Sequence, residues 1–151
     1  MGRERFSYNS ASSYKQTMSK IVVSKMEEAK VIEVAENYIR AFKEIKPELI
    51  AKYFLPEFVK IGYFYDYEKK DWMDLSTHSF HQVLEWTSQY NSNEIMPDSN
   101  VSTTLLDLQD KTAVVKVVAE WAPNRWGGDY VMLSKKNNDW FITAIFWQSI
   151  I

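Results

Sequence analysis

Hydrophobic residues recur at helical spacing in the first third of the chain. Between Ser24 and Lys46, apolar side chains return every three or four residues, and charged side chains occupy the opposite face. Ser24 precedes Glu27 at capping-box spacing, which predicts a helix start there. Pro47 ends this helix and begins a second one over residues 48–55, because proline fits the first turn of a helix but not its interior.

The following residues predict strands with one more helix between them. β-Branched and aromatic residues predict a strand over residues 58–66, and residues 70–75 fit a short strand that pairs with it. Ser76 or Thr77 is the expected cap of a third helix that runs to about Tyr90. Further strands are predicted over residues 101–108, 112–121, 129–136 and 140–150. Helices followed by hairpin-linked strands indicate an α+β fold with antiparallel pairing.

The N-terminal residues 1–23 are rich in serine and show little apolar periodicity. We expect a disordered or loosely docked leader there, and a single domain over residues 24–151. Both Met1 and Met18 stay open as translation starts, because the residues before Met18 carry no predicted element.

Alternation in the last strands predicts a second apolar face on the sheet. Strand 112–121 has one wholly apolar face, which should cover the helices, whereas strands 129–136 and 140–150 are substantially apolar on both faces. A sheet covered by helices on one side normally keeps its other side polar. We therefore expect a homodimer through the outer face. The residues predicted to form it are Tyr130, Met132, Phe141, Ile145 and Trp147.

Asp129 breaks the apolar pattern of its strand. It shares a phase with Val131 and Leu133, so its carboxyl group is predicted to point inward. A buried acid must find a partner or stay protonated.

The order of elements and several stretches resemble the NTF2-like (cystatin-like) superfamily. The stretches are residues 35–42 (AENYIRAF), 53–62 (YFLPEFVKIG), 110–117 (DKTAVVKV), 129–133 (DYVML) and 140–146 (WFITAIF). Together they resemble the branch of putative lumazine-binding or SnoaL-like proteins over about residues 26–150. The resemblance implies a curved antiparallel sheet that wraps the first helix around a conical cavity.

Ketosteroid isomerase is the enzyme of this superfamily that offers a comparison. Its oxyanion hole uses a tyrosine and a protonated aspartic acid, and the resemblance assigns these to Tyr38 and Asp129. The aspartate base of that enzyme falls on Gly62, or on Tyr63 after a slip of one residue, and neither is a carboxylate base. The nearest acid is Asp66. Tyr38 and Asp129 either bond each other across the cone or contact a ligand, and both interpretations remain open.

Other candidate residues add little specific chemistry. His78 and His81 lie near the predicted third helix with Asp74, but the spacing supplies no further metal ligand, so no metal site is predicted. His81 and Asp66 are weak candidates for a substitute base. Aromatic residues of the predicted strands can rim a pocket or simply pack, and Trp121 ends the wholly apolar face. The expected ligand-binding residues are Tyr38, Phe42, Tyr63, Trp121, Asp129 and Phe146.

Composition and charge narrow the function classes. The net charge is −2, so there is no overall field to attract nucleic acid or an anionic membrane. Cysteine is absent, which excludes thiolate chemistry and suits the cytoplasm. Gly127 and Gly128 do not form a phosphate-binding loop, and no cofactor is predicted.

Three functions therefore remain open. The first is a small-molecule binding protein with an apolar or aromatic pocket, anchored by Tyr38 and Asp129. The second is a SnoaL-like or isomerase-type enzyme that acts on a cyclic ketone or a polyketide-like substrate. The third is a dimeric interaction domain without a ligand.

Overall fold

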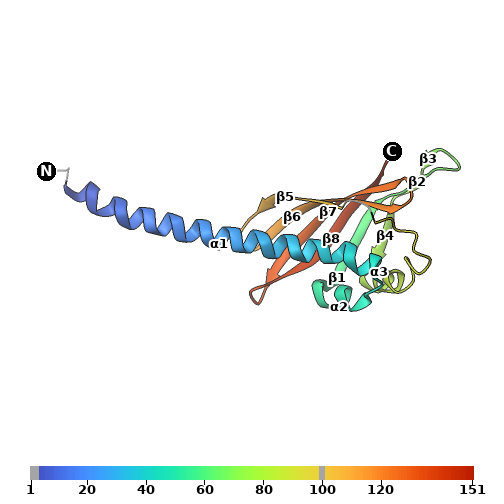
Figure 1. Ribbon diagram of the computed structural model, residues 1–151, viewed down its shortest axis with the longest axis horizontal. Coiled ribbons are helices and arrows are strands. Elements are labelled where there is room, and N and C mark those ends of the chain that lie inside the picture. Colours follow the sequence, from blue (N-terminus) through green and yellow to red (C-terminus); the bar gives the residue numbers. More distant parts are fainter. Residues whose placement is uncertain (1–3, 99–100) are drawn as a thin grey trace. The chain divides into compact units, whose positions relative to one another are not determined.

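A computed structural model describes residues 4–98 and 101–151 of the chain. Residues 1–3 of the predicted leader and residues 99–100 of the predicted loop lie outside this range. The chain divides into two units, a first one that ends at Lys30 and a second one, Val31–Ile151, that holds the sheet. Figure 1 shows the elements in the order in which the chain forms them.

Helix α1 (Glu4–Lys43) begins much earlier than the predicted start at Ser24. Its early residues are serine-rich, but neither glycine nor proline occurs between Gly2 and Pro47, so nothing interrupts a helix once it has formed. The side chains of residues 12–26 are exposed, which explains why the apolar periodicity begins only after them.

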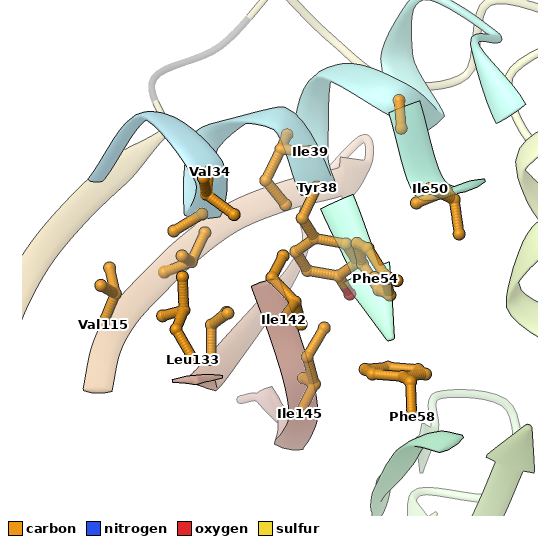
Figure 2. Close-up of a cluster of buried hydrophobic side chains, with 14 of the residues drawn as sticks. Val34, Tyr38, Ile39, Ile50, Phe54, Phe58, Val115, Leu133, Ile142 and Ile145 are labelled. Atoms are coloured by element: carbon orange, nitrogen blue, oxygen red, sulfur yellow. The ribbon is translucent and has the colours of Figure 1, made fainter. Parts of the chain in front are cut away.

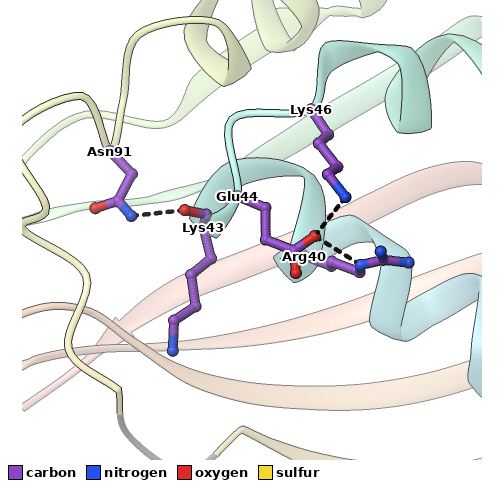
Figure 3. Close-up of polar contacts among 5 residues, drawn as sticks. All are labelled: Arg40, Lys43, Glu44, Lys46 and Asn91. Carbon is purple, nitrogen blue, oxygen red and sulfur yellow. Dashed lines mark hydrogen bonds and ion pairs between the residues drawn. The ribbon is translucent and has the colours of Figure 1, made fainter.

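The end of α1 is fixed by side-chain contacts. Asn91 donates a hydrogen bond of 2.7 Å from Nδ2 to the carbonyl oxygen of Lys43, and its Oδ1 accepts one from the Met96 backbone. Glu44 forms ion pairs with Arg40 and Lys46, as Figure 3 shows. The chain then turns into helix α2 (Pro47–Tyr53), which has proline in its first turn as expected.

Strands form two sheets in the part of the chain that the structure describes. The six-stranded sheet has the order β4-β1-β8-β7-β6-β5, and a small hairpin pairs β2 with β3. Strand β1 pairs with β8 in parallel, so the large sheet is mixed, and the prediction of purely antiparallel pairing is wrong at this point. The bounds are β1 (Phe54–Tyr63), β2 (Tyr65–Asp66), β3 (Asp71–Trp72), β4 (Ser76–Ser79), β5 (Ser102–Leu108), β6 (Thr112–Ala122), β7 (Arg125–Lys136) and β8 (Asp139–Ile150).

Helix α3 (Phe80–Thr87) starts later than Ser76 or Thr77. Ser79 is its cap: the Ser79 hydroxyl accepts from the Gln82 backbone, and the Gln82 side chain accepts from the Ser79 backbone. The residues predicted to open the helix instead form β4, which pairs with the edge of β1. The capping box at Ser79 therefore sets the start of the helix, three residues after Ser76.

The core lies between the sheet and the second part of α1. Val31, Val34 and Tyr38 of the helix are buried against strand residues such as Val115 and Ile142. Figure 2 shows Tyr38 extending from α1 toward Phe54, with its hydroxyl oxygen on the side away from the helix. A tyrosine hydroxyl placed this deep needs a hydrogen-bonding partner.

A bulge in β8 changes which residues face the core. The register shifts between the pairs Met132–Ala144 and Leu133–Ile142, and one extra residue reverses the alternation beyond it. Ile145 is 1% exposed and Trp147 packs against the core, so both face inward, whereas Phe146 is 52% exposed. The predicted outward orientation of Ile145 and Trp147 and the predicted inward orientation of Phe146 are therefore wrong.

Among the described residues, no helix combines the length and the apolar character needed to cross a membrane.

Candidate functional site

Polar side chains gather on the inner face of the sheet in two rows that run across the strands. Partners in neighbouring strands point to the same face, so register alone places these side chains side by side. The first row joins Asp129 of β7, Trp147 of β8 and Gly62 of β1. The second row joins Ile145 of β8, Lys60 of β1 and His78 of β4.

Lys60 is the central residue of this site, and it was not among the predicted site residues. Its side chain is buried at 8% exposure, and its Nζ donates a hydrogen bond of 2.8 Å to the hydroxyl oxygen of Tyr38. The sequence did contain a signal for Lys60, because it shares one phase of the strand with the aromatic residue Phe58 and with Gly62. The structure buries all three. Charged residues are almost never fully buried without a partner, so this one needs a reason.

Aromatic rings surround the Lys60 amino group. The distances from Nζ to the ring centroids are 4.9 Å for Trp147, 5.2 Å for Trp121, 5.3 Å for Tyr38 and 6.0 Å for Phe42. Ring faces attract a cation but offer a neutral amine no strong acceptor. Burial lowers the pKa of Lys60, and the negative charge of Asp129 opposes that effect.

The rings also pack against one another. Trp121 contacts Phe42, Tyr38 and Tyr90 with centroid separations of 5.2 to 5.8 Å. The Tyr90 hydroxyl donates to the backbone carbonyl oxygen of Trp121 at 3.1 Å, which holds Tyr90 beside this end of β6. The predicted residues Tyr38, Phe42 and Trp121 are therefore brought together, and Tyr90 joins them.

Asp129 is buried, as its strand phase predicted. It is 1% exposed, and no donor among the described residues reaches either of its carboxyl oxygens with hydrogen-bond geometry. Burial raises the pKa of Asp129, while the positive charges of Lys60 and Lys116 and the nearby Tyr38 hydroxyl lower it. Burial, and after it the charge of Asp129, raises the pKa of Tyr38 well above its ordinary value, so the phenol keeps its proton.

Trp147 is held over the bare backbone of Gly62. A Cβ atom on Gly62 would lie 2.0 Å from the Trp147 carbonyl oxygen and 2.5 Å from its indole ring, so only glycine fits. The indole Nε1 is buried and has no hydrogen-bond partner in the described part of the chain. Gly62, to which the resemblance assigns the isomerase base, thus cannot carry any side chain.

His78 completes the group. It pairs with Lys60 across β1 and β4, and its ring lies 4.3 Å from that of Trp86. Its Nδ1 is buried without a partner among the described residues. Burial, and after it the charge of Lys60, lowers the pKa of His78, which favours the neutral imidazole.

The remaining predicted residues lie away from this site. Tyr63 is 40% exposed and belongs to the opposite phase of β1. The carboxylate of Asp66 accepts from the backbones of Glu68 and Lys69, so it stabilises a turn. His81 is exposed on α3 beside Phe80. Within residues 4–98 and 101–151, no group of three histidine, aspartate or glutamate side chains is arranged to hold a metal.

A family model described as "Putative lumazine-binding" matches residues 26–148. No curated protein matches the chain. Solved structures with the same fold include an NTF2-like protein of unknown function from Silicibacter pomeroyi, with 15% identity, a TM-score of 0.67, and coverage of 84% of this chain and 98% of that one. Another, from Methylobacillus flagellatus, has 21% identity, a TM-score of 0.61, and coverage of 83% and 93%. A ketosteroid isomerase-like protein from Erwinia carotovora atroseptica has 11% identity, a TM-score of 0.56, and coverage of 82% and 95%.

Proposed function

The chain belongs to the family described as putative lumazine-binding and has the NTF2-like fold, and from this premise we propose that it binds a small flat molecule against Lys60, Asp129 and Trp147. The observation that carries the proposal is a set of buried hydrogen-bonding atoms without partners. They are both carboxyl oxygens of Asp129, Nε1 of Trp147 and Nδ1 of His78. Each such atom costs about 1–3 kcal/mol when it stays unpaired, so a ligand that pairs several of them is favoured.

The chemistry of these groups specifies the edge of the ligand. Trp147 and Lys60 supply N–H donors toward a carbonyl oxygen, whereas an ionised Asp129 accepts an N–H. The rings of Phe42 and Trp121 lie beside them and favour a flat, weakly polar body. A heterocycle with carbonyl and N–H groups along one edge fits both requirements, and lumazine has such an edge.

Ligand entry is proposed beside the partly buried members of the group. His78, Trp121 and Trp147 are each partly exposed, unlike Lys60 and Asp129. A molecule that enters between these rings reaches the buried charges last. Specific polar contacts at the inner end of a largely apolar site are typical of small-molecule binding proteins.

Calorimetry and tryptophan fluorescence test the proposal with lumazine, related pteridines and flat bicyclic ketones as probes. We expect saturable binding that Asp129→Asn and Trp147→Phe each weaken by at least about tenfold, because each removes one hydrogen-bonding group. Trp72→Phe is the matched control, since Trp72 is exposed on β3, in the separate small sheet. Equal affinity in wild type and both site variants would contradict the proposal.

An isomerase-type enzyme is the second candidate, and His78 is the observation that favours it. The neutral, unpaired Nδ1 of His78 lies next to Lys60, so a base is present even though Gly62 carries none. The substrate would be a cyclic ketone or a polyketide-like compound. Exchange of α-protons for deuterium, followed by NMR, tests this, and His78→Gln should abolish any exchange that the wild type catalyses.

A homodimer through the outer face of the sheet is also proposed. Tyr130 and Phe146 are cross-strand partners and exposed on that face, with Met132 and Phe141 partly exposed nearby. A second copy would cover this apolar surface. Dimerisation without any ligand is the third function, and it would be indicated by a stable dimer that binds none of the probes. The cysteine-free sequence is the basis for proposing a cytoplasmic location.

A further inference from the structure

Lys60 differs from the other lysines in its surroundings. Of the lysine side chains that the structure describes, it alone is buried, and no carboxylate there lies within 4.0 Å of its amino group. Its one hydrogen bond goes to a neutral hydroxyl, that of Tyr38. Burial without a close counter-ion lowers the pKa of Lys60, which increases the fraction of free amine, the nucleophilic form.

We propose that Lys60 captures a carbonyl compound, an aldehyde or ketone, as a Schiff base. The inference rests on the proposed function, because the carbonyl group would belong to a ligand that occupies the same site. The geometry that carries it is the buried amino group with Tyr38, Asp129 and Trp147 around it.

The reaction needs no reagent beyond the two partners. The Lys60 nitrogen attacks the carbonyl carbon, a C–N bond forms, and one nitrogen-bound proton is transferred to the oxygen, which gives a carbinolamine. The hydroxyl group then takes a second proton and leaves as water. The nitrogen lone pair forms the C=N bond, and the nitrogen loses its remaining proton. The sum is an amine plus a carbonyl giving an imine plus water.

Neighbouring groups can donate and accept the protons that move in these steps. The Tyr38 hydroxyl accepts from Lys60 Nζ and keeps its own O–H, which can donate to the carbonyl oxygen. Asp129 lies on the same inner face of the sheet. Its carboxyl group can give a proton to the leaving hydroxyl and take one back from the nitrogen. Burial raises the pKa of Asp129 toward neutral pH, where a carboxyl group can both donate and accept a proton.

Reductive trapping tests the proposal with benzaldehyde and sodium cyanoborohydride at about pH 6.5, followed by peptide mass mapping. Lys136 is the internal reference, because it is exposed. We expect Lys60 to be labelled at least about tenfold faster than Lys136, since each unit by which the pKa falls gives about tenfold more free amine. In urea-unfolded protein, the two lysines should react at similar rates.

Variants separate reactivity from folding. Lys60→Met should remove the fast labelling and Lys136→Met should retain it. The wild-type peptide map decides the question even if Lys60→Met fails to fold. Equal labelling of Lys60 and exposed lysines, or an unlabelled Lys60 in folded protein, would overturn the proposal.

The two experiments distinguish failure of the Schiff base at Lys60 from failure of the proposed ligand binding. Reversible binding of lumazine or a ketone probe, without any trapped adduct on Lys60, would overturn the Schiff base and leave the binding site standing. Absence of both binding and trapping would overturn the two together.

Discussion

At the scale of single residues, the site depends on groups that are costly to bury. Asp129 and Lys60 are both buried, yet no ion pair within 4.0 Å joins them. Burial lowers the pKa of Lys60 and raises that of Asp129. The charge of each residue opposes this shift in the other, but burial is the larger effect for both. The folded protein therefore retains a destabilising arrangement, and such arrangements are common where a ligand or a reaction requires them.

Replacing Asp129 with asparagine should change how stability depends on pH. The folded pKa of Asp129 is raised above its ordinary value of 3.8, so below that value the carboxyl group is protonated in both states and has little effect. As the pH rises, the unfolded chain releases the proton first, and wild type loses stability until the folded pKa is passed. The asparagine side chain cannot ionise, so the stability of Asp129→Asn relative to wild type should increase as the pH is raised from about 4 to about 8.

Urea unfolding of both proteins across that range measures the difference. Asp74→Asn serves as the control, because Asp74 is exposed and makes no hydrogen bond within the described residues. A stability difference between wild type and Asp129→Asn that stays constant with pH would show that Asp129 does not titrate as described.

At the scale of elements, two strands and their register form the site. The bulge in β8 turns Trp147 inward, and the parallel pairing of β1 with β8 then places Gly62 beneath it. The same pairing sets Lys60 next to Ile145, and the β1–β4 pairing adds His78. A shift of one residue in either strand would move these side chains to the outer face.

Substitution of Gly62 by alanine should strongly destabilise the sheet. The new Cβ would lie 2.0 Å from the Trp147 carbonyl oxygen, and a backbone atom cannot rotate away. We expect a loss of about 3 kcal/mol in the free energy of unfolding, at the upper end for overpacking. Chemical denaturation measures this loss.

Gly128→Ala is the matched control for Gly62→Ala. Its Cβ would meet the ends of flexible side chains, Lys116 Nζ at 3.1 Å and Ile150 Cδ1 at 3.2 Å. Those atoms can move, so the cost should stay below about 1 kcal/mol. Similar losses in the two variants would mean that the close packing of Trp147 on Gly62 is not what requires glycine.

At the scale of the whole molecule, the outer face of the sheet exposes large apolar side chains. Tyr130 and Phe146 are the exposed aromatic pair on this face. The Lys116 amino group lies 3.9 Å from the centroid of the Tyr130 ring. The bulge in β8 changes the residues of the proposed dimer interface, because it turns Ile145 and Trp147 inward and exposes Phe146.

Phe146→Glu should convert the proposed dimer to a monomer. A charged carboxylate in the centre of an apolar interface must be desolvated without a partner, which costs several kcal/mol. Size-exclusion chromatography with light scattering at tens of micromolar measures the mass. Met73→Glu, on an equally exposed apolar residue outside the large sheet, should leave the mass unchanged. A wild-type monomer at that concentration would rule out the dimer.

Local sequence patterns were enough to predict the α+β class, the apolar stripe of α1 from Val31, and the inward orientation of Asp129. These follow from local periodicity, which depends only on where side chains point along one element. Only the tertiary structure showed that β1 pairs in parallel with β8, that a bulge exchanges the faces of Phe146 and Trp147, and that Lys60 meets Tyr38. Register and bulges depend on contacts between segments far apart in the chain, so no pattern within one segment contains them.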